Sequence, residues 1–322
     1  MRAADLIRFQ QGMVSHAQLL SLGTSPEVIK WQLASGRWQR VYRGVYATFT
    51  GTPQREAKLW AAVLRAGQGA MLSHETAAEV HGFADRTSSR IHITVPADSH
   101  PARHQRIADV VMHRSSVSGP DRLPPWQLPR TSLADTILDL VAAARTDDDA
   151  YAWLSRVITS RLVTPEFVVE ASAGRKKMPR RAWLSEALTD LADGVHFPLE
   201  RRWYRDVERA HGLPRAHRQV KVKHANGTRY LDNLYEDYGV CVELDGKIAH
   251  PDEHRSRDRR RDNENVARYD TETLRYSYED VANHPCEQAA QLAITLTRRG
   301  WPATTLKPCH PGCPVSALIK GR

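Results

Sequence analysis

Cysteine is scarce in this chain of 322 residues: there are only four, Cys241, Cys286, Cys309 and Cys313. So few and so scattered thiols exclude the disulfide framework of a small secreted protein. Long apolar runs are lacking too, because no stretch approaches the about 18 consecutive apolar residues of a membrane span. The first residues also have no apolar signal core. These absences predict a cytoplasmic protein with no membrane partner.

Acidic residues are outnumbered by basic ones. The 46 lysines and arginines against 37 aspartates and glutamates give a formal net charge of +9, and the pI is near 9.5. This excess favours a polyanionic partner such as DNA, although many basic proteins never touch nucleic acid. The hydrophobic content of 41% is normal for a folded protein. At this length we expect a multidomain α+β chain of two or three domains.

The most informative segment is 229–250, which predicts a two-stranded hairpin with apolar and polar side chains alternating along its second arm. If the turn lies at residues 236–239, Asp232 lies opposite Glu243. Facing residues on paired strands have Cβ atoms about 5 Å apart. Two carboxylates at that range repel each other unless a cation or a proton lies between them. The hairpin therefore predicts a site for a divalent metal ion, Mg²⁺ or Mn²⁺.

This grouping resembles the PD-(D/E)XK nuclease motif, in which an Asp precedes a Glu-x-Lys on the neighbouring strand. Here Asp232 precedes Glu243-Leu244-Asp245, so an Asp stands in the place of the Lys. A wider stretch, residues 197–301, resembles a domain family related to the very-short-patch-repair endonucleases. The segments that carry this resemblance are Pro198–Arg202, the ELDG sequence at 243–246, His250, Arg255–Asp262 and Thr273–Arg275.

The resemblance implies a restriction-endonuclease-like α/β domain over residues 196–302 and Mg²⁺-dependent hydrolysis of a DNA phosphodiester. Asp232 and Glu243 would bind the metal, together with the carbonyl of Leu244. The residues alone leave a plainer alternative open, in which the acidic groups are paired surface charges next to an arginine-rich helix.

Further residues receive roles by the same resemblance. Glu200, on the helix that begins the fold, would support the metal or its water. Asp245 would join either the metal ligands or the residues that surround them. His250 would transfer a proton in place of the Lys. Apart from the resemblance, the charge of the predicted arginine-rich helix makes Arg257 and Arg261 candidates to neutralise DNA phosphates.

The first fifty residues predict a winged helix-turn-helix, residues 1–50. Helices are expected over 5–11, 15–20 and 26–34, and Ser25 and Pro26 provide a strong start for the third. In that helix we expect Val28, Ile29 and Leu33 to face inward. An arginine-rich hairpin over 37–46 completes the module.

A winged helix places its third helix in the major groove, while the wing contacts phosphates or the minor groove. The DNA-binding candidates are Lys30, Gln32, Arg37, Arg40 and Arg43. The sequences Gln11–Leu19 and Ser35–Ala47 resemble the N-terminal domain of AbiEi-type antitoxins, which are transcriptional autoregulators of type IV toxin-antitoxin systems. A module that only packs against protein is the alternative.

Two functions from different classes thus stay open. One is a metal-dependent DNA endonuclease. The other is a repressor or antitoxin whose nuclease-like domain has lost catalysis, with a cognate toxin as partner, and Asp245 at the Lys position favours it. A homodimer is compatible with either function.

The remaining parts of the chain are less informative. Residues 51–195 predict a mixed α/β and helical connector, whose histidines match no metal motif by spacing. Its basic run, 175–181, is interpreted as a linker that contacts DNA or is solvated. The tail, 303–322, offers Cys309, His310 and Cys313 without an obvious fourth ligand, so we expect an ordinary flexible tail and no structural zinc.

Overall fold

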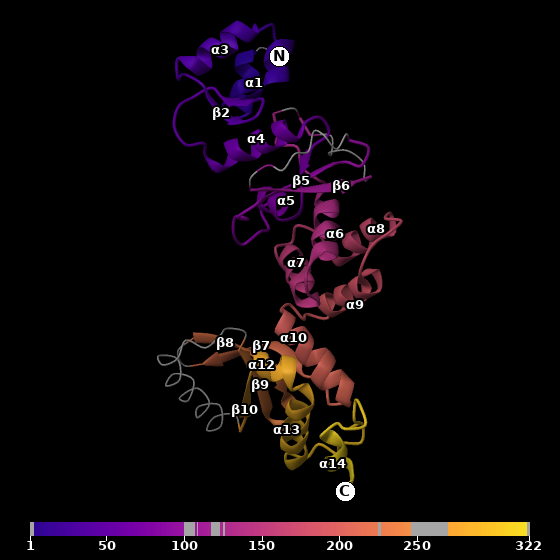
Figure 1. Ribbon diagram of the computed structural model, residues 1–322. Helices are drawn as coiled ribbons and strands as arrows, with labels where there is room; N and C mark the ends of the chain where they lie inside the picture. Colours follow the sequence, from indigo (N-terminus) through magenta and orange to yellow (C-terminus); the bar gives the residue numbers. More distant parts are fainter. Residues whose placement is uncertain are drawn as a thin grey trace. The chain divides into compact units, whose positions relative to one another are not determined.

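The computed structural model describes residues 3–99, 107, 109–116, 123–124, 126–224, 227–245 and 270–320. The chain divides into two compact units, Met1–Ser185 and Glu186–Arg322, whereas the sequence suggested a boundary after residue 195. Both units combine helices with a sheet (Figure 1), which confirms the multidomain α+β class. Among the described residues, no helix has the length and apolar character needed to cross a membrane.

The first unit begins with three helices and a small sheet. The helices are α1 (Ala3–Phe9), α2 (His16–Ser21) and α3 (Pro26–Ala34), and the strands are β1 (Met13–Ser15), β2 (Gln39–Tyr42) and β3 (Val45–Ala47). The strands are antiparallel in the order β1-β3-β2. The three helices and the hairpin therefore occur within about two residues of the bounds expected from local signals.

Side-chain caps explain where two of these helices begin. Ser15 Oγ accepts a hydrogen bond from the Gln18 backbone N–H at 3.2 Å, and the Gln18 side chain accepts one from the Ser15 N–H at 2.9 Å. This reciprocal capping box starts α2. Ser25 Oγ accepts from the Val28 N–H at 3.4 Å, and Pro26 occupies the first helical position, as predicted.

Among the described residues up to 192, the chain also has a second sheet and six more helices. The short strand β4 (Met71–Leu72) pairs antiparallel with β5 (Ile91–Pro96), which pairs parallel with β6 (Val110–Ser115). The helices are α4 (Arg55–Ala66), α5 (His74–His81), α6 (Leu133–Ala143), α7 (Asp147–Thr159), α8 (Pro165–Ala173) and α9 (Arg181–Ala192). The last two were not predicted. Met13 and Val45 are buried in the same core as Trp60 and Ile93, so the N-terminal module and this sheet share one apolar interior.

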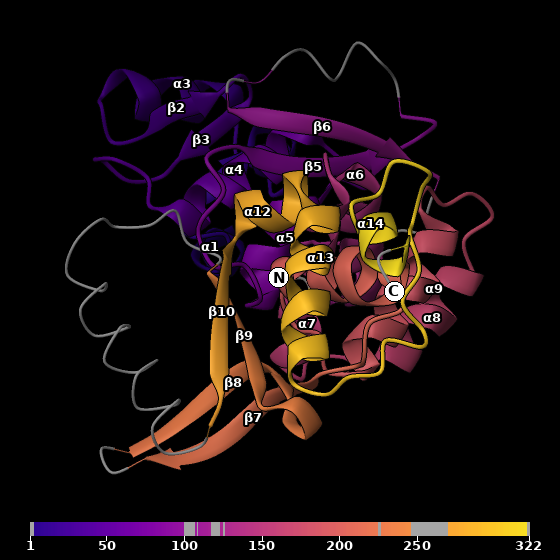
Figure 2. The ribbon, with the colours of Figure 1, turned by 90° about the horizontal axis from the view of Figure 1, so that it is seen from below.

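The second unit is built on a four-stranded sheet of order β10-β9-β8-β7 (Figure 2). The strands β7 (His217–His224), β8 (Gly227–Tyr235) and β9 (Val240–Asp245) are antiparallel neighbours, and β10 (Glu272–Ser277) is parallel to β9. A short 3₁₀ turn, η3 (Glu236–Tyr238), joins β8 to β9. The hairpin lies where the sequence predicted it.

Helices precede and follow this sheet along the chain. The helix α10 (Pro198–Arg202) continues directly into a π-helix, η2 (Trp203–Arg209). After β10 come α12 (Tyr278–Asn283), α13 (Pro285–Arg298) and α14 (Val315–Lys320). Trp203 and Leu292 pack with Val240 and Val242 in one core, so helices from both ends of the unit cover the central strand.

A buried carboxylate joins η2 to the sheet. Glu208 is 1% exposed, and it accepts hydrogen bonds from Tyr235 Oη at 2.6 Å and from the Arg218 guanidinium at 3.2 Å. The indole N–H of Trp203 donates to Tyr235 Oη at 3.2 Å. Burial raises the pKa of the Glu208 carboxyl and that of the Tyr235 hydroxyl. Because water cannot replace these partners, the network specifies how the helix sits on the strands.

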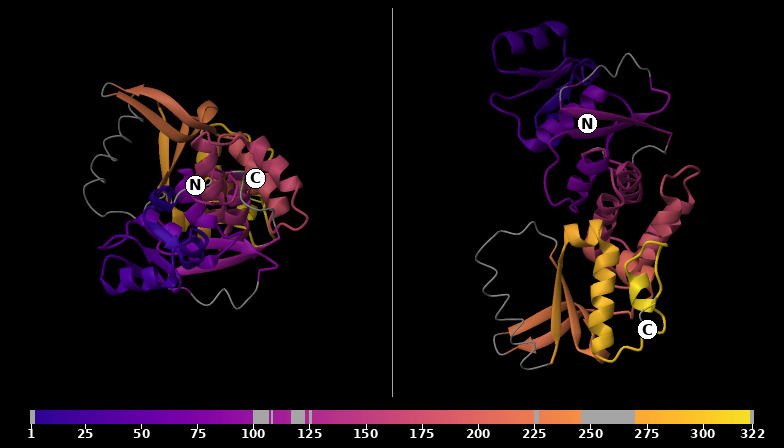
Figure 3. Two further views of the ribbon diagram at one scale, coloured as in Figure 1. Left: turned by 90° about the horizontal axis from the view of Figure 1, so that it is seen from above. Right: turned by 60° about the horizontal axis from the view of Figure 1, so that its bottom comes forward.

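The C-terminal segment packs into the second unit. Ala303, Cys313 and Val315 are buried in the unit's core, and α14 lies beside α13 (Figure 3). The Thr305 hydroxyl also donates to the carbonyl of Gly212 at 2.6 Å. The expectation of an ordinary flexible tail was therefore wrong, because apolar side chains between the prolines and cysteines are buried against helices distant in sequence.

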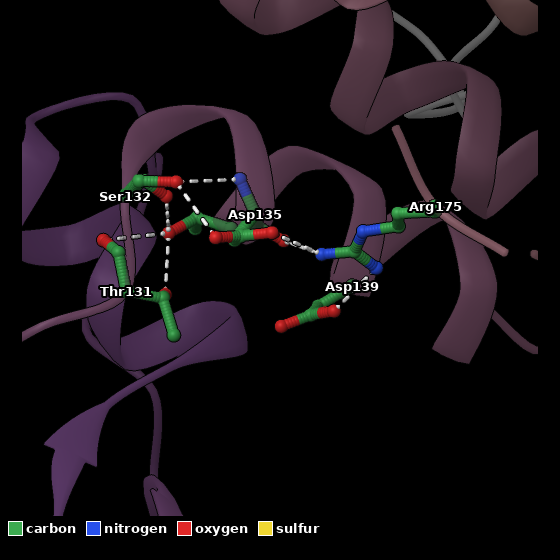
Figure 4. Close-up of polar contacts among 6 residues, drawn as sticks. Thr131, Ser132, Asp135, Asp139 and Arg175 are labelled. Carbon is green, nitrogen blue, oxygen red and sulfur yellow. Dashed lines mark hydrogen bonds and ion pairs between the residues drawn. The ribbon is translucent and has the colours of Figure 1, made fainter. Parts of the chain in front are cut away.

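The arginines of the basic run 175–181 bond to helices of the first unit, and Figure 4 shows the contacts of Arg175. Arg175 donates to the carboxylates of Asp135 and Asp139, both at 2.8 Å. Arg180 and Arg181 likewise donate to oxygens of the same unit. The interpretation of this run as a solvated or DNA-contacting linker is corrected for these three arginines. Arg175 and Arg180 donate to carboxylates and Arg181 donates to the carbonyl of Ser172, all on helices of the first unit.

Replacing Arg175 with methionine should lower the free energy of unfolding by about 2–4 kcal/mol, because two part-buried carboxylates would lose their cation and its hydrogen bonds. Chemical denaturation monitored by circular dichroism measures this change. Lys176→Met, at an exposed position of the same run, should change the stability by less than about 0.5 kcal/mol. Equal stability of the two variants would disprove the role given to Arg175.

Candidate functional site

Asp232 and Glu243 occupy facing positions on β8 and β9. The register pairs Asn233 with Val242, and its continuation by one residue sets Asp232 opposite Glu243. The Leu244 backbone N–H donates to Asp232 Oδ2 at 3.0 Å, which ties the Asp232 side chain to the neighbouring strand.

Gln219 connects Asp232 to Glu200. Its side-chain Nε2 donates to Glu200 Oε1 at 2.8 Å and to Asp232 Oδ1 at 3.3 Å. Gln219 lies on β7 between residues paired with Asn233 and Leu231, hence opposite Asp232. Its φ of 50° is in the left-handed region, which costs a non-glycine residue about 1–3 kcal/mol. Sequence reasoning missed Gln219 because a lone amide in a polar strand carries no pattern.

Glu200 is buried at the start of α10, with 6% of its surface exposed. Its Oε2 accepts from the backbone N–H groups of His196 at 2.9 Å and Phe197 at 3.3 Å, so it caps its own helix. Burial raises the pKa of the Glu200 carboxyl, and the nearby Asp232 carboxylate raises it further, while the hydrogen bonds that Glu200 accepts lower it. Glu200 therefore caps its helix and also lies near Asp232.

Glu243 pairs with Arg275, directly opposite on β10, at 2.7 Å. The Glu243 side chain is 13% exposed, and Cys241, two residues earlier on β9, is fully buried. Asp245, at the end of β9, is exposed. The ion pair is of the kind that the plainer alternative predicted, so a metal ion bound by Glu243 would share this carboxylate with Arg275.

The donor set of this group consists of oxygen: the carboxylates of Asp232 and Glu243 and the carbonyl of Leu244. Hard oxygen ligands of this kind suit Mg²⁺ or Mn²⁺. Three other residues assigned by the resemblance, His250, Arg257 and Arg261, lie outside the described residues.

The candidate DNA-binding residues lie on the surface of the N-terminal module. Lys30 on α3, Arg40 on β2 and Arg43 in the hairpin turn are exposed, and Gln32 is partly exposed. Arg37 is exposed too, and its guanidinium carbon lies 4.8 Å from the ring centroid of Trp31. The hairpin therefore presents its arginines to solvent, as a phosphate-binding wing requires.

The outward surface of α3 differs in part from the expected pattern. Ile29 and Leu33 pack inward, but Val28 is 46% exposed and Trp31 is 53% exposed. Ile29 and Leu33 are four residues apart and form one narrow stripe, whereas Val28 is rotated by about 100° from it. The expectation that Val28 faces inward was wrong. Tryptophan and arginine are both enriched at protein interfaces. The spacing of residues in the sequence did not single out Trp31.

Side chains that can bind a metal also meet elsewhere in the described part of the chain, in two groups that sequence reasoning did not connect. One consists of His211, Cys286, Cys309 and Cys313, and the other of His74, His92 and His113. The expectation that Cys309 and Cys313 lack further ligands is therefore corrected, because His211 and Cys286 come from helices far away in the sequence.

Residues 1–48 match the model of a family described as "Transcriptional regulator, AbiEi antitoxin". This match confirms the resemblance predicted for the N-terminal module, and it bears on that module alone. Among solved structures, the chain is similar to the RV2827C protein from Mycobacterium tuberculosis, with 18% identity and a TM-score of 0.39. That similarity covers 69% of this chain and 86% of the other. No curated protein matches the chain.

His74, His92 and His113 form a cluster of uncharged histidines in the first unit. His92 Nδ1 and His113 Nε2 are 3.1 Å apart, and the rings of His74 and His113 stack at 3.7 Å with an interplanar angle of 16°. The nitrogen lone pairs lie in the ring planes, so two stacked imidazoles cannot both point at one ion as they lie. They line a pocket of about 1010 Å³. Ser73 Oγ bonds to His74 Nδ1 at 3.0 Å and does not cap α5.

Lowering the pH should destabilise the first unit, because its folded state keeps these histidines uncharged. Burial, followed by the neighbouring His113 and His92, lowers the pKa of His74 to about 3, and burial and then His92 lower that of His113 to about 4. An unfolded histidine titrates near pH 6.5. The unfolded chain therefore binds protons that the folded chain does not, and stability falls as the pH drops from about 6.5.

Thermal unfolding between about pH 7.5 and pH 5 measures this effect. His74→Asn is a suitable comparison, because asparagine does not titrate and tolerates the φ of 50° at this position. The difference in stability between the wild type and the variant should narrow as the pH falls. A difference that stays constant over the range would contradict the assignment.

Proposed function

We propose that the protein binds DNA through its N-terminal module and hydrolyses a DNA phosphodiester with a divalent metal ion held in its second unit. One observation carries the nuclease part: Asp232 and Glu243 face each other on adjacent strands, and Glu200 is joined to Asp232 by Gln219. Glu200 lies close enough to Asp232 for the Asp232 carboxylate to raise the pKa of Glu200, and two carboxylates this close repel each other unless a cation or a proton lies between them.

The order of the elements supports the same proposal. A helix with Glu200 comes first, the hairpin with Asp232 and Glu243 follows, and β10 then adds a parallel strand next to β9. This is the order of motifs on which the resemblance to the repair endonucleases rests. The metal ligands would be the Asp232 and Glu243 carboxylates and the Leu244 carbonyl.

When bound, Mg²⁺ would lower the pKa of a coordinated water and polarise the phosphate. The chain's own residues prepare the site for this. The Leu244 N–H and the Gln219 amide orient Asp232, and Gln219 also holds Glu200 close to it. Arg275 offsets the charge of Glu243 while the ion is absent. His250 and Asp245 keep the roles in proton transfer and metal support that the resemblance implies.

Asp232→Asn should reduce Mg²⁺- or Mn²⁺-dependent nicking of supercoiled plasmid by at least about 100-fold. A neutral amide binds the metal ion more weakly than a carboxylate, and the bound ion stabilises the transition state by several kcal/mol. Asn keeps the size of the side chain and an oxygen for the Leu244 N–H. Asp237→Asn, an exposed aspartate in the turn of the same hairpin, is the matched control and should nick at the wild-type rate. Full activity of the Asp232 variant would overturn the assignment.

A regulator without catalysis is the second candidate, and the Glu243–Arg275 ion pair favours it. This pair at 2.7 Å satisfies the carboxylate without a metal ion, and Asp245 replaces the Lys of the nuclease motif. In this case the chain would bind its own promoter without a metal requirement and would act with a cognate toxin. Specific promoter binding without cleavage of any plasmid would select this candidate.

DNA binding by the N-terminal module should depend on where the positive charge lies. Replacing Arg37, Arg40 and Arg43 together by alanine should weaken DNA binding by at least about 10-fold. It should also reduce the slope of log K against log salt by up to about 3, since each phosphate contact contributes about 0.9. Fluorescence anisotropy with a labelled duplex measures both quantities.

The control for this variant removes the same charge elsewhere on the first unit. Arg86, Lys176 and Lys177 are exposed and lie outside the N-terminal module. Their triple alanine variant should retain the affinity and the salt slope of the wild type. Equal losses in the two triple variants would mean that net charge, and not the wing, determines binding.

A further inference from the structure

Four side chains that can bind a metal ion meet where the C-terminal tail contacts the helices of the second unit. His211 lies just beyond η2, Cys286 is the second residue of α13, and Cys309 and Cys313 lie on the tail. One ligand atom from each side chain lies within 4.8 Å of every other. The residues come from three distant segments, so no spacing in the sequence marks them as a set.

The distances suit a tetrahedral ion better than a disulfide. Zinc holds sulfur at about 2.3 Å and nitrogen at about 2.0–2.1 Å, which in a tetrahedron separates the ligand atoms by about 3.5–3.8 Å. The sulfur atoms of Cys286 and Cys309 are 3.4 Å apart, well beyond the about 2.05 Å of a disulfide. All four cysteines of the chain are described, and none forms a disulfide.

His211 is oriented as a metal ligand. Its ring is fully buried, and Nδ1 lies 3.0 Å from the carbonyl oxygen of Val207. A carbonyl only accepts, so Nδ1 carries the proton and Nε2 carries the lone pair. Nε2 is buried and has no hydrogen-bond partner among the described residues. An unpaired buried acceptor costs about 1–3 kcal/mol, whereas a histidine ligand commonly donates its other N–H to a carbonyl in this way.

We propose that the second unit binds one Zn²⁺ through the thiolates of Cys286, Cys309 and Cys313 and through Nε2 of His211. Three sulfurs and one imidazole nitrogen are a donor set that selects zinc among the common divalent ions. All four positions are filled by the protein, which is typical of a structural site and not of a catalytic one. The exposed His310, whose Nε2 is 3.5 Å from Cys286 Sγ, lies at the rim.

The ion would join the tail to the two helices on which it lies. Cys313 is 2% exposed and sits in the core with Val315. The Lys307 N–H donates to the His211 carbonyl at 3.0 Å. At Gly212 a Cβ atom would lie 2.0 Å from the Thr305 carbonyl oxygen, so only glycine allows this close approach. These contacts place the tail for ligation independently of the metal.

The zinc site does not involve the carboxylates of the proposed nuclease. Glu200 and His211 are eleven residues apart on one helical stretch, or roughly 16 Å along an α-helix. The two sites also differ in ligands, since one offers oxygen and the other sulfur and nitrogen. Metal content is measured without DNA, so failure of this proposal and failure of the proposed function are distinguishable.

The test is the metal content of the full chain, purified under reducing conditions without added metal and measured by inductively coupled plasma mass spectrometry. We expect about one zinc per chain, as for a closed structural site. The Cys309→Ser/Cys313→Ser variant should contain none. Cys241→Ala, which changes the one cysteine outside the group, should retain the zinc. A wild-type chain that stays free of zinc even after incubation with Zn²⁺ would overturn the proposal.

Three further measurements test the site even if the double variant fails to fold. His211→Cys converts the site into four thiolates and should retain zinc, and cobalt-loaded wild type should show the absorption of tetrahedral thiolate coordination. Chelation under reducing conditions should lower the Tm of the wild type by more than about 5 °C. A Cys286–Cys309 disulfide in the unreduced protein, found by mass spectrometry together with an absence of zinc, would refute the site.

Discussion

The buried hydrogen bonds of Glu208 to Tyr235 and Arg218 hold the helix of the second unit on its sheet, and the candidate sites of that unit depend on them. Eight residues before Glu208 on the same helical stretch, Glu200 is joined through Gln219 to Asp232 of the hairpin. Three residues after it, His211 points at the cysteines. A buried carboxylate without its partners is costly, so the helix has one favourable position on the strands. The positions of Glu200 and His211 in the two sites therefore depend on where this helix packs on the strands.

Ligand chemistry separates the two proposed metal sites. The hairpin group offers carboxylate and carbonyl oxygens, and its Glu243 is paired with Arg275. Oxygen ligands shared with an arginine suit an ion that is bound weakly and exchanges readily. The tail group offers thiols and an imidazole from segments that are already packed, which suits an ion held permanently. The first would serve chemistry on a phosphodiester and the second would serve stability. An enzyme with both could lose its Mg²⁺ and stay folded.

Positive charge in the first unit is used in two ways. The hairpin arginines Arg40 and Arg43 are exposed, in a module that matches a family of transcriptional regulators. Arg175 is instead bound between Asp135 and Asp139 and holds helices together. Net charge therefore suggested a polyanionic partner but did not tell which arginines are available to it. Burial and pairing distinguish the two kinds of arginine, because two neighbouring carboxylates neutralise the charge of Arg175 and occupy its hydrogen-bond donors.

The sequence by itself determined the features that depend on near neighbours. The cap of α3 at Ser25, the turn before β9 and the pairing of Asp232 with Glu243 follow from alternation and turn chemistry within a few residues. Only the tertiary structure brought Gln219 to Glu200, Arg275 to Glu243 and Cys286 to His211. Those contacts join segments that are far apart in the chain. Their geometry follows from how helices pack on the sheet, and no local pattern encodes that packing.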